Sequence, residues 1–282
     1  MDVSFTVKPS GAALGAEVLG LDLAAPLSPD NSAALREALL QHILLVFPGQ
    51  NLTPAQAAQF CRNFGPITRH ILDQFYHPEE ADLCIISNVV ESGKGRTTAR
   101  MAGSYWHSDL SYLAEPVDAS MLYAIEVPES GGDTLFANMY DVFETLPEAV
   151  QTRLRGLKAV HNLMSGSGSD AKVTLTEAQR AKVPDAVHSV VRRHSETGRD
   201  ALYVNPGFTR RIEGMDAAES YALLQELYDH ASQERFTYRH KWRSGDLTLF
   251  DGRASMHTAT GGYTSIERRT LWRAFIGGRY AA

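Results

Sequence analysis

The chain has 282 residues, of which 44% are hydrophobic and 21% are charged, and its formal net charge is −6. This composition is typical of a globular enzyme, and the acidic balance argues against a nucleic-acid partner or an anionic membrane surface. The N-terminal stretch lacks the apolar core of a signal peptide, the longest apolar run spans only residues 43–47, and two cysteines make no disulfide framework. We therefore expect a cytoplasmic protein without a membrane span, long enough for one large domain or two small ones.

The first half of the chain predicts short strands and two helices. Strands are expected at residues 5–9, 43–47 and 82–90, and the first helix is expected over 33–42 with its caps at 30–32. The second helix has clear signals, since Thr53 is a good N-cap, Pro54 suits the first helical position and Gly65 lies just past the end.

The second half is dominated by strand signals. One helix is predicted there, with Asp216 as its N-cap and Glu219 completing a capping box. Strands are predicted at 119–127, on both sides of a Glu-Thr-Gly turn within 187–205, and at 236–242, 247–251 and 268–278. Many short strands, few helices and glycine-rich turns indicate a mainly β protein with flanking helices and a jelly-roll (double-stranded β-helix) core.

Two polar segments, residues 91–104 and 165–185, interrupt this pattern. Both are rich in Gly, Ser and Thr and lack apolar periodicity, so we predict that both are mobile loops. Long loops in a compact domain are often lids over a site, and plain disorder is the alternative.

The string YWHSDLSY, residues 105–112, contains the first candidate site. Alternate residues of a strand point to the same face, so an extended segment would place the His107 imidazole beside the Asp109 carboxylate. The pair suits a metal ion, and it equally suits a simple hydrogen bond. His257 is the candidate third ligand, because it follows a predicted strand end at Asp251 and a jelly roll can bring such an end opposite His107.

The remaining histidines that we considered have structural interpretations. His42 and His230 lie in predicted helices, His240 lies in a predicted strand as a surface or half-buried residue, and His194 lies in a turn. Two His and one carboxylate leave three positions of an octahedral ion open, which is the arrangement of non-haem Fe(II) oxygenases. Zinc hydrolases can use the same ligand types, although the common HExxH string is absent.

Two further segments could hold an anionic partner. Thr134 follows a flexible Gly pair in GGDT and offers a hydroxyl donor. In RRTLWRAF, Arg269 and Arg273 would share one face of a strand, while Arg268 would take the other. Inward guanidinium groups need anionic partners, because a buried unpaired charge is costly. Those partners are either the chain's own acidic side chains or a dicarboxylate cosubstrate.

Taken together and in this order, the motifs resemble those of the Fe(II)/2-oxoglutarate-dependent dioxygenases of the taurine dioxygenase / dichlorophenoxyacetate dioxygenase (TauD/TfdA) family. The resemblance covers nearly the whole chain, through LLVFPGQ, RNFGP, ISNV, WHSD, GGDT, YRHKWRSGDLTLFDGRASMH and RR-x-L-x-RA. It implies a single dioxygenase domain over residues 1–282 with Fe(II), 2-oxoglutarate and O2 as cofactor and cosubstrates. We also expect a homo-oligomer, either a dimer or a tetramer.

The resemblance implies roles for individual residues. The matches to the iron ligands are His107, Asp109 and His257, and the matches to the groups that hold the distal carboxylate of 2-oxoglutarate are Thr134 and Arg269. Arg268 competes with Arg269 for that role, because the preceding loop can be aligned one residue longer or shorter. Arg273 then matches a substrate-side arginine, and His70 falls near a histidine that contacts the substrate's anionic group. Thr258 is a departure, since many relatives carry Arg there, and we expect it to change the pocket rim or the loop packing rather than the iron.

The implied reaction is hydroxylation of a small anionic organic substrate of the aryloxyalkanoate, alkylsulfonate or alkyl sulfate class, followed by C–O or C–S cleavage, with release of succinate and CO2. The alternatives are a hydroxylase of another small carboxylate metabolite and a non-catalytic jelly-roll module that binds metal or ligand. A dinucleotide-binding interpretation of GSGSDA, residues 166–171, fails because no helix start follows and no βαβ series surrounds it. Tyr105, Trp106, Tyr112 and Phe208 could line an apolar wall, although strand aromatics are more often core residues.

Overall fold

The computed structural model describes residues 4–89, 103–163, 175–264 and 266–279. Its largest sheet has seven strands in the order β1-β2-β3-β13-β5-β15-β4. The strands are β1 (Thr6–Pro9), β2 (Ala16–Leu19), β3 (Leu44–Phe47), β4 (Cys84–Ser87), β5 (Ala119–Glu126), β13 (Leu247–Asp251) and β15 (Thr270–Ile276). All neighbours are antiparallel except β2 and β3. Strands predicted in both halves of the chain therefore join one sheet, which includes the first strand, β1, and the last, β15.

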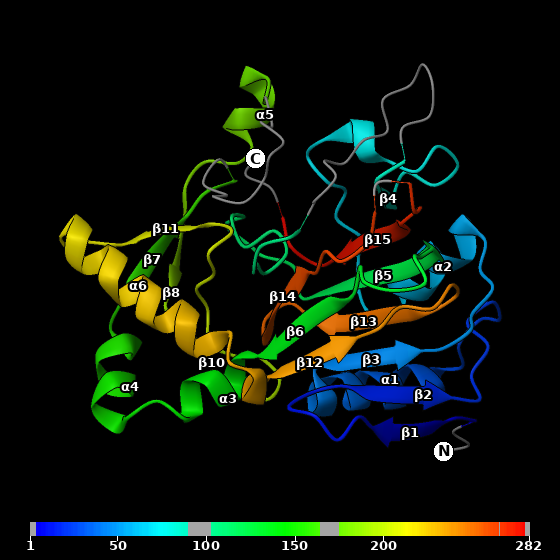
Figure 1. Cartoon of the computed structure of the whole chain (residues 1–282), viewed down its shortest axis with the longest axis horizontal. Coiled ribbons are helices and arrows are strands. Elements are labelled where there is room, and N and C mark those ends of the chain that lie inside the picture. Colours follow the sequence, from blue (N-terminus) through cyan, green and yellow to red (C-terminus); the bar gives the residue numbers. More distant parts are fainter. Residues whose placement is uncertain (1–3, 90–102, 164–174, 265, 280–282) are drawn as a thin grey trace.

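A smaller sheet lies beside the large one (Figure 1) and consists of β12 (Thr237–His240), β6 (Thr134–Asn138) and β14 (Ser255–Ala259). The ring of Phe136 in β6 contacts the ring of Phe250 in β13, with 5.0 Å between centroids. The two sheets thus share one core and form the two layers of a jelly roll, which confirms the predicted fold class. Two further sheets contain β11 (Thr209–Ile212), β7 (Lys158–His161) and β8 (Ala186–Ser189), and β10 (Asp200–Leu202) with β9 (Val191–Arg193).

Helices cover both ends of this β structure. The described helices are α1 (Pro29–His42), α2 (Pro54–Arg62), α3 (Met139–Glu144), α4 (Glu148–Arg155), α5 (Glu177–Ala181) and α6 (Ala217–Ala231), with 3₁₀ turns at Asp73–Phe75 and Glu234–Phe236. Helices α1 and α2 pack on the large sheet, whereas α3 and α6 pack on each other and on β10 and β11 (Figure 1). No helix in the described ranges combines the length and the apolar character that crossing a membrane requires.

The capping signals in the sequence predicted two helix starts correctly. Thr53 accepts the backbone N–H of Gln56, and the Gln56 side chain accepts the N–H of Thr53, so α2 begins with a full capping box. The Asp216 carboxylate accepts two backbone N–H groups at the start of α6. In both cases the side chain satisfies donors that a helix start leaves unpaired.

Other helix predictions were incomplete or wrong. The first helix begins at Pro29, not after residues 30–32, because Ser28 accepts the N–H of Asn31 and Pro suits the first helical position. Helices α3 and α4 were not predicted. Residues 91–102 of the first predicted loop and 165–174 of the second lie outside the described residues, and the described remainder of the second loop, 175–185, contains α5.

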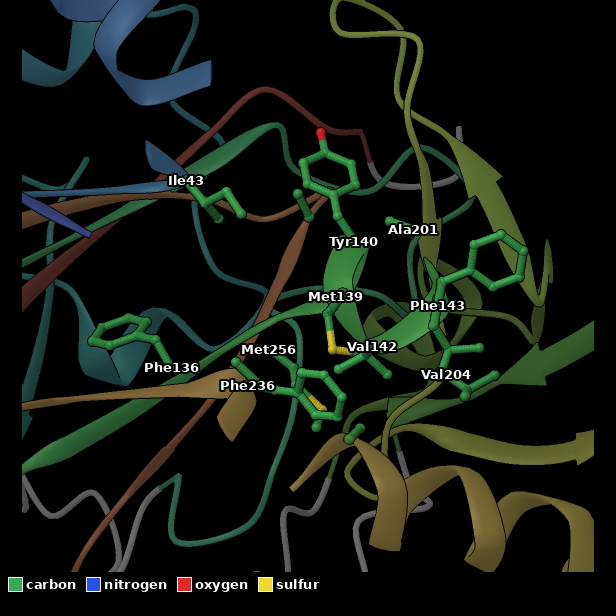
Figure 2. Close-up of a cluster of buried hydrophobic side chains, with 14 of the residues drawn as sticks. Ile43, Phe136, Met139, Tyr140, Val142, Phe143, Ala201, Val204, Phe236 and Met256 are labelled. Carbon is green, nitrogen blue, oxygen red and sulfur yellow. The ribbon is translucent and has the colours of Figure 1, made fainter. Parts of the chain in front are cut away.

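The largest apolar core lies between the two jelly-roll sheets and helices α3 and α6. Figure 2 shows part of it, with Phe136 and Met256 from the small sheet, Val142 and Phe143 from α3, and Phe236. A second core separates the large sheet from α1 and α2. A third and smaller cluster contains Tyr112, Phe208 and Phe275 and lies where the candidate site residues meet.

A buried ionic network fixes the end of β13, one turn before the strand that carries His257. Asp251 is 1% exposed and accepts hydrogen bonds from Arg253 through two guanidinium nitrogens and from Nε2 of His194 at 3.0 Å. Burial alone would raise the pKa of Asp251, but these donors lower it below its ordinary value. His194 is therefore a buried partner of Asp251 as well as a turn residue. His240 is buried too, at 4% exposed, so its assignment as a surface or half-buried residue was wrong.

Replacing Asp251 with Ala would leave His194 buried without its carboxylate partner and would remove one of the two carboxylates that accept hydrogen bonds from Arg253, the other being Glu196 at 2.7 Å. We expect the free energy of unfolding to fall by about 3–5 kcal/mol at neutral pH, as for a broken buried ion pair. Because the folded-state pKa is lowered, this contribution is complete above about pH 4 and is lost as the pH falls further. Denaturant titration should detect both effects.

The matched control is Arg36→Ala, which removes a half-exposed arginine that pairs with Glu196 at 2.9 Å. Exposed ion pairs contribute about 0–1 kcal/mol, so this variant should stay close to the parent protein. If the free energy of unfolding fell equally in the two variants, the buried network would contribute no more to stability than an exposed ion pair.

Candidate metal centre

Backbone pairing brings His107 and His257 together across 150 residues of sequence. The N–H of His107 donates to the carbonyl of His257 at 2.9 Å, and the N–H of His257 donates back at 2.8 Å. Residues paired directly in this way present their side chains on the same face, and the two imidazole centroids are 4.2 Å apart. The segment before Asp109 thus extends the small sheet beyond β14.

Asp109 reaches the same place by a turn, which corrects the expectation of a continuous strand. The chain is extended only around His107 and turns directly after it, and Leu110 adopts a left-handed conformation with φ 48°. The hydroxyl of Ser108 donates to the carbonyl of Ser255 at 3.0 Å and holds the turn against β14. The carboxylate of Asp109 then lies 3.7 Å from Nε2 of His107.

Hydrogen bonding orients the His107 ring for metal binding. Nδ1 of His107 lies 2.8 Å from the carbonyl oxygen of Tyr105, which can only accept, so Nδ1 carries the proton and Nε2 keeps its lone pair. Burial lowers the pKa of both His107 and His257, the latter to about 3. Burial would raise the pKa of Asp109, but the nearby His257 and Arg273 lower it overall. Neutral imidazoles and an ionised carboxylate are the protonation states that a metal ion requires.

The donor set fits a divalent metal ion. One ligand atom from each of His107, Asp109 and His257 lies within 4.8 Å of the other two, and all three side chains are buried. Oδ2 of Asp109 is buried and has no hydrogen-bond partner among the described residues. A buried carboxylate oxygen without a donor is costly, and a bound cation would supply what is missing. Two His and one carboxylate suit non-haem Fe(II).

Arg269, the first of the two candidate anion-binding arginines, is a buried cation. It is 6% exposed, its Nε donates to the carbonyl of Gly132 at 2.9 Å, and no acidic side chain in the described ranges forms an ion pair with it. Burial lowers its pKa, which is the expected effect on a cation without a counter-ion. A Cβ on Gly132 would lie 3.0 Å from Cδ of Arg269, so a glycine is needed for this approach. Arg268, by contrast, is exposed and pairs with Glu126 at 2.8 Å.

Arg273 and His70 share an aromatic support, the ring of Phe275. A guanidinium nitrogen of Arg273 is 3.6 Å from Asp109, and the guanidinium lies over the ring of Phe275 at 4.4 Å. The His70 ring stacks on Phe275 at 5.8 Å and accepts the N–H of Leu72 through Nδ1. Burial, and then the charge of Arg273, lower the pKa of His70 to about 3. His70 is therefore neutral, with its proton on Nε2.

Aromatic rings line another wall of the centre. Phe208 contacts the rings of Tyr105, His107 and Tyr112, with centroid distances of 4.9–6.2 Å. Trp106, the fourth aromatic residue considered from the sequence, packs instead against the core between the sheets. Phe275, Gly207 and Trp242 belong to the site's surroundings and were not predicted, because nothing in their local sequence distinguishes them from core or turn residues.

The model of the taurine catabolism dioxygenase TauD, TfdA family matches residues 6–275. The chain belongs to the TauD/TfdA family. It is 34% identical to the alpha-ketoglutarate-dependent 2,4-dichlorophenoxyacetate dioxygenase of Cupriavidus pinatubonensis, over 96% of this chain and 97% of the relative. It is 31% identical to pentalenolactone F synthase of Streptomyces avermitilis, over 93% of this chain and 90% of that protein. The solved structure of AAD-2 in complex with Mn(II) and N-oxalylglycine superposes with a TM-score of 0.83 at 28% identity, covering 98% of both chains.

In this member of the TauD/TfdA family, the two residues after His257 bond to the segment that precedes His107. The hydroxyl of Thr258 bonds to the carbonyl of Gly103 at 3.3 Å, and the N–H of Ala259 donates to the same carbonyl at 2.7 Å. Thr258 therefore fastens the segment that leads into His107. This contact agrees with the expectation that Thr258 affects loop packing.

Gly207 gives a test of how closely the aromatic wall is fitted to the metal ligands. A Cβ at Gly207 would lie 2.6 Å from Cε2 of Tyr105 and 2.8 Å from Cβ of His107, so Gly207→Ala must displace one of them. We expect Mn(II) affinity, measured by calorimetry, to fall at least about tenfold, since small shifts of a ligand weaken a metal site.

Gly156→Ala is the matched control, because a Cβ there meets only the Arg153 carbonyl at 3.9 Å. It should bind Mn(II) as the parent protein does. If the two alanine variants bound Mn(II) equally well, the proposed close fit around His107 would be wrong.

Proposed function

We propose that the chain is an Fe(II)- and 2-oxoglutarate-dependent dioxygenase that hydroxylates a small anionic organic substrate. The observation that carries the proposal is the convergence of His107, Asp109 and His257 on one buried site. The same chain has in Arg269 a buried cation with no acidic partner in its described part. The three ligands suit a metal ion. The buried Arg269 needs an anionic partner, which a dicarboxylate would supply. Similarity to alpha-ketoglutarate-dependent relatives supports the same reaction class.

One set of residues would bind the metal ion and another set would bind the cosubstrate. His107, Asp109 and His257 would hold the ferrous ion on one face and leave its other positions open. Arg269 and the hydroxyl of Thr134 would bind the distal carboxylate of 2-oxoglutarate. When bound, iron and 2-oxoglutarate supply the oxidising power from O2, releasing succinate and CO2 while the substrate gains a hydroxyl group.

Arg273 and His70 would bind the anionic group of the primary substrate. Nε of Arg273 is buried without a hydrogen-bond partner among the described residues, and neutral His70 offers an N–H donor. Tyr105 and Phe208 provide an aromatic wall on which an aryl group can pack. These features favour an aryloxyalkanoate over an alkylsulfonate or alkyl sulfate. Hydroxylation next to the ether oxygen would give a hemiacetal that breaks its C–O bond, as the C–S bond would break in a sulfonate.

A second candidate is hydroxylation of another small carboxylate metabolite, which the similarity to pentalenolactone F synthase favours. The anion-binding pair Arg273 and His70 would serve either substrate. A cytoplasmic location, a homo-oligomeric state and a single domain over residues 1–282 complete the proposal and depend on the sequence alone.

Spectroscopy and product analysis test the reaction class. Anaerobic addition of Fe(II) and 2-oxoglutarate should give a visible charge-transfer band, and oxygen with the right aryloxyalkanoate, sulfonate or alkyl sulfate should release succinate in step with substrate loss. His107→Ala should abolish both, whereas His42→Ala, in α1, should retain both. A parent protein that shows no band would refute the proposal. A band without succinate from any substrate or from uncoupled turnover would indicate the non-catalytic module.

Arg269 and Arg268 can be separated by substitution. We expect Arg269→Gln to raise the KM for 2-oxoglutarate by about 30- to 150-fold, because a buried charge-assisted bond contributes about 2–3 kcal/mol. Arg268→Gln should change this KM less than about twofold, since Arg268 is exposed and pairs with Glu126. Steady-state kinetics at saturating substrate would measure both. The opposite ranking would show that the loop before β15 is assigned one residue out of place.

A further inference from the structure

The hydroxyl of Thr134 has a donor already bonded to it. The indole Nε1 of Trp242 lies 2.9 Å from Oγ1 of Thr134, and both side chains are buried, at 7% and 2% exposed. An indole N–H can only donate, so Oγ1 of Thr134 is the acceptor. No acceptor for the hydroxyl hydrogen of Thr134 is present among the described residues. Within the described residues, the hydrogen of this hydroxyl is therefore free to bond to a ligand.

Trp242 is held rigidly in this position. It lies two residues after the end of β12, and its ring meets the ring of His240 edge-on, with 4.4 Å between centroids and 89° between planes. His240 is paired directly across from Thr134 in the β12–β6 ladder and lies 3.4 Å from Asp246. Thr134, His240 and Trp242 therefore lie on one side of the small sheet and pack as one unit.

Arg269 contacts the segment before Thr134 through a hydrogen bond that does not involve Trp242. Its Nε donates to the carbonyl of Gly132, two residues before Thr134, which leaves the terminal guanidinium nitrogens for another acceptor. The Arg269 guanidinium therefore contacts the segment that carries Thr134, although the two residues are distant in sequence. Preorganised donors of this kind bind an anion without the cost of reorienting first.

We propose that Trp242 is a positioning residue for 2-oxoglutarate. By donating to Oγ1 of Thr134, Trp242 forces the Thr134 hydroxyl to act as a donor toward the distal carboxylate of the cosubstrate. Trp242 does not itself touch 2-oxoglutarate and acts only through Thr134. This inference rests on the proposed function, and it predicts that Trp242 affects only keto acids with a distal carboxylate.

The test compares two keto acids in the anaerobic Fe(II) protein. Trp242→Phe keeps an aromatic ring and removes the N–H, so the Kd for 2-oxoglutarate should rise about three- to tenfold, as for one lost hydrogen bond. The Kd for 2-oxobutyrate, which lacks the distal carboxylate, should stay unchanged. The ratio of the two constants does not depend on the fraction of folded variant, so a folding defect cannot mimic the result. Trp272→Phe, on the other face of β15 against Tyr123, is the matched control and should change neither.

A double-mutant cycle tests the route through Thr134. In a Thr134→Val background, Trp242→Phe should have no further effect on 2-oxoglutarate binding. The proposal would be overturned if Trp242→Phe raised the Kd equally for both keto acids. It would also be overturned if Trp242→Phe raised the Kd for 2-oxoglutarate as much in the Thr134→Val background as in the parent protein. A parent protein that binds neither keto acid at its iron would instead refute the proposed function.

Discussion

Two backbone hydrogen bonds between His107 and His257 hold the whole site together. They join a segment that lies before β5 to a strand near the end of the chain, and they fix the two imidazoles on one face. The ionic network around Asp251 secures the turn before β14, and Thr258 and Ser108 tie the two segments together on either side of the pair. The jelly roll therefore acts as a rigid frame that brings distant residues within bonding range.

Several charged side chains around the site are only partly paired with other protein groups. Asp109 has three cations or potential cations as neighbours, and the two histidines are kept neutral by burial, so the anion of the site is available to a metal ion. Arg269 is buried without an acidic partner among the described residues, and Nε of Arg273 lacks an acceptor there. A metal ion, a dicarboxylate and an anionic substrate would together remove each of these imbalances. Buried charges that lack partners cost folding free energy, and the same charges are suited to binding ligands.

The sequence predicted local features well and long-range ones only through motifs. The capping signals of Thr53 and Asp216 and the strand at 247–251 depend on neighbouring residues, and they were correct. The turn at Asp109 depends on a left-handed Leu110, an apolar residue that gives no turn signal, and the cap at Ser28 was missed because Asp30 and Ser32 compete as caps. The burial of His240 and the contacts of Trp242 arise from cross-strand packing, which a single sequence does not encode in any one segment.

A crystal structure grown anaerobically with Mn(II) and N-oxalylglycine, a stable mimic of 2-oxoglutarate, tests the central claim most directly. The account predicts one metal ion per chain, about 2.0–2.2 Å from Nε2 of His107, a carboxylate oxygen of Asp109 and Nε2 of His257, with the far carboxylate of the mimic on Arg269. A metal bound elsewhere, or these three side chains engaged only with other protein groups while the mimic is present, would contradict it.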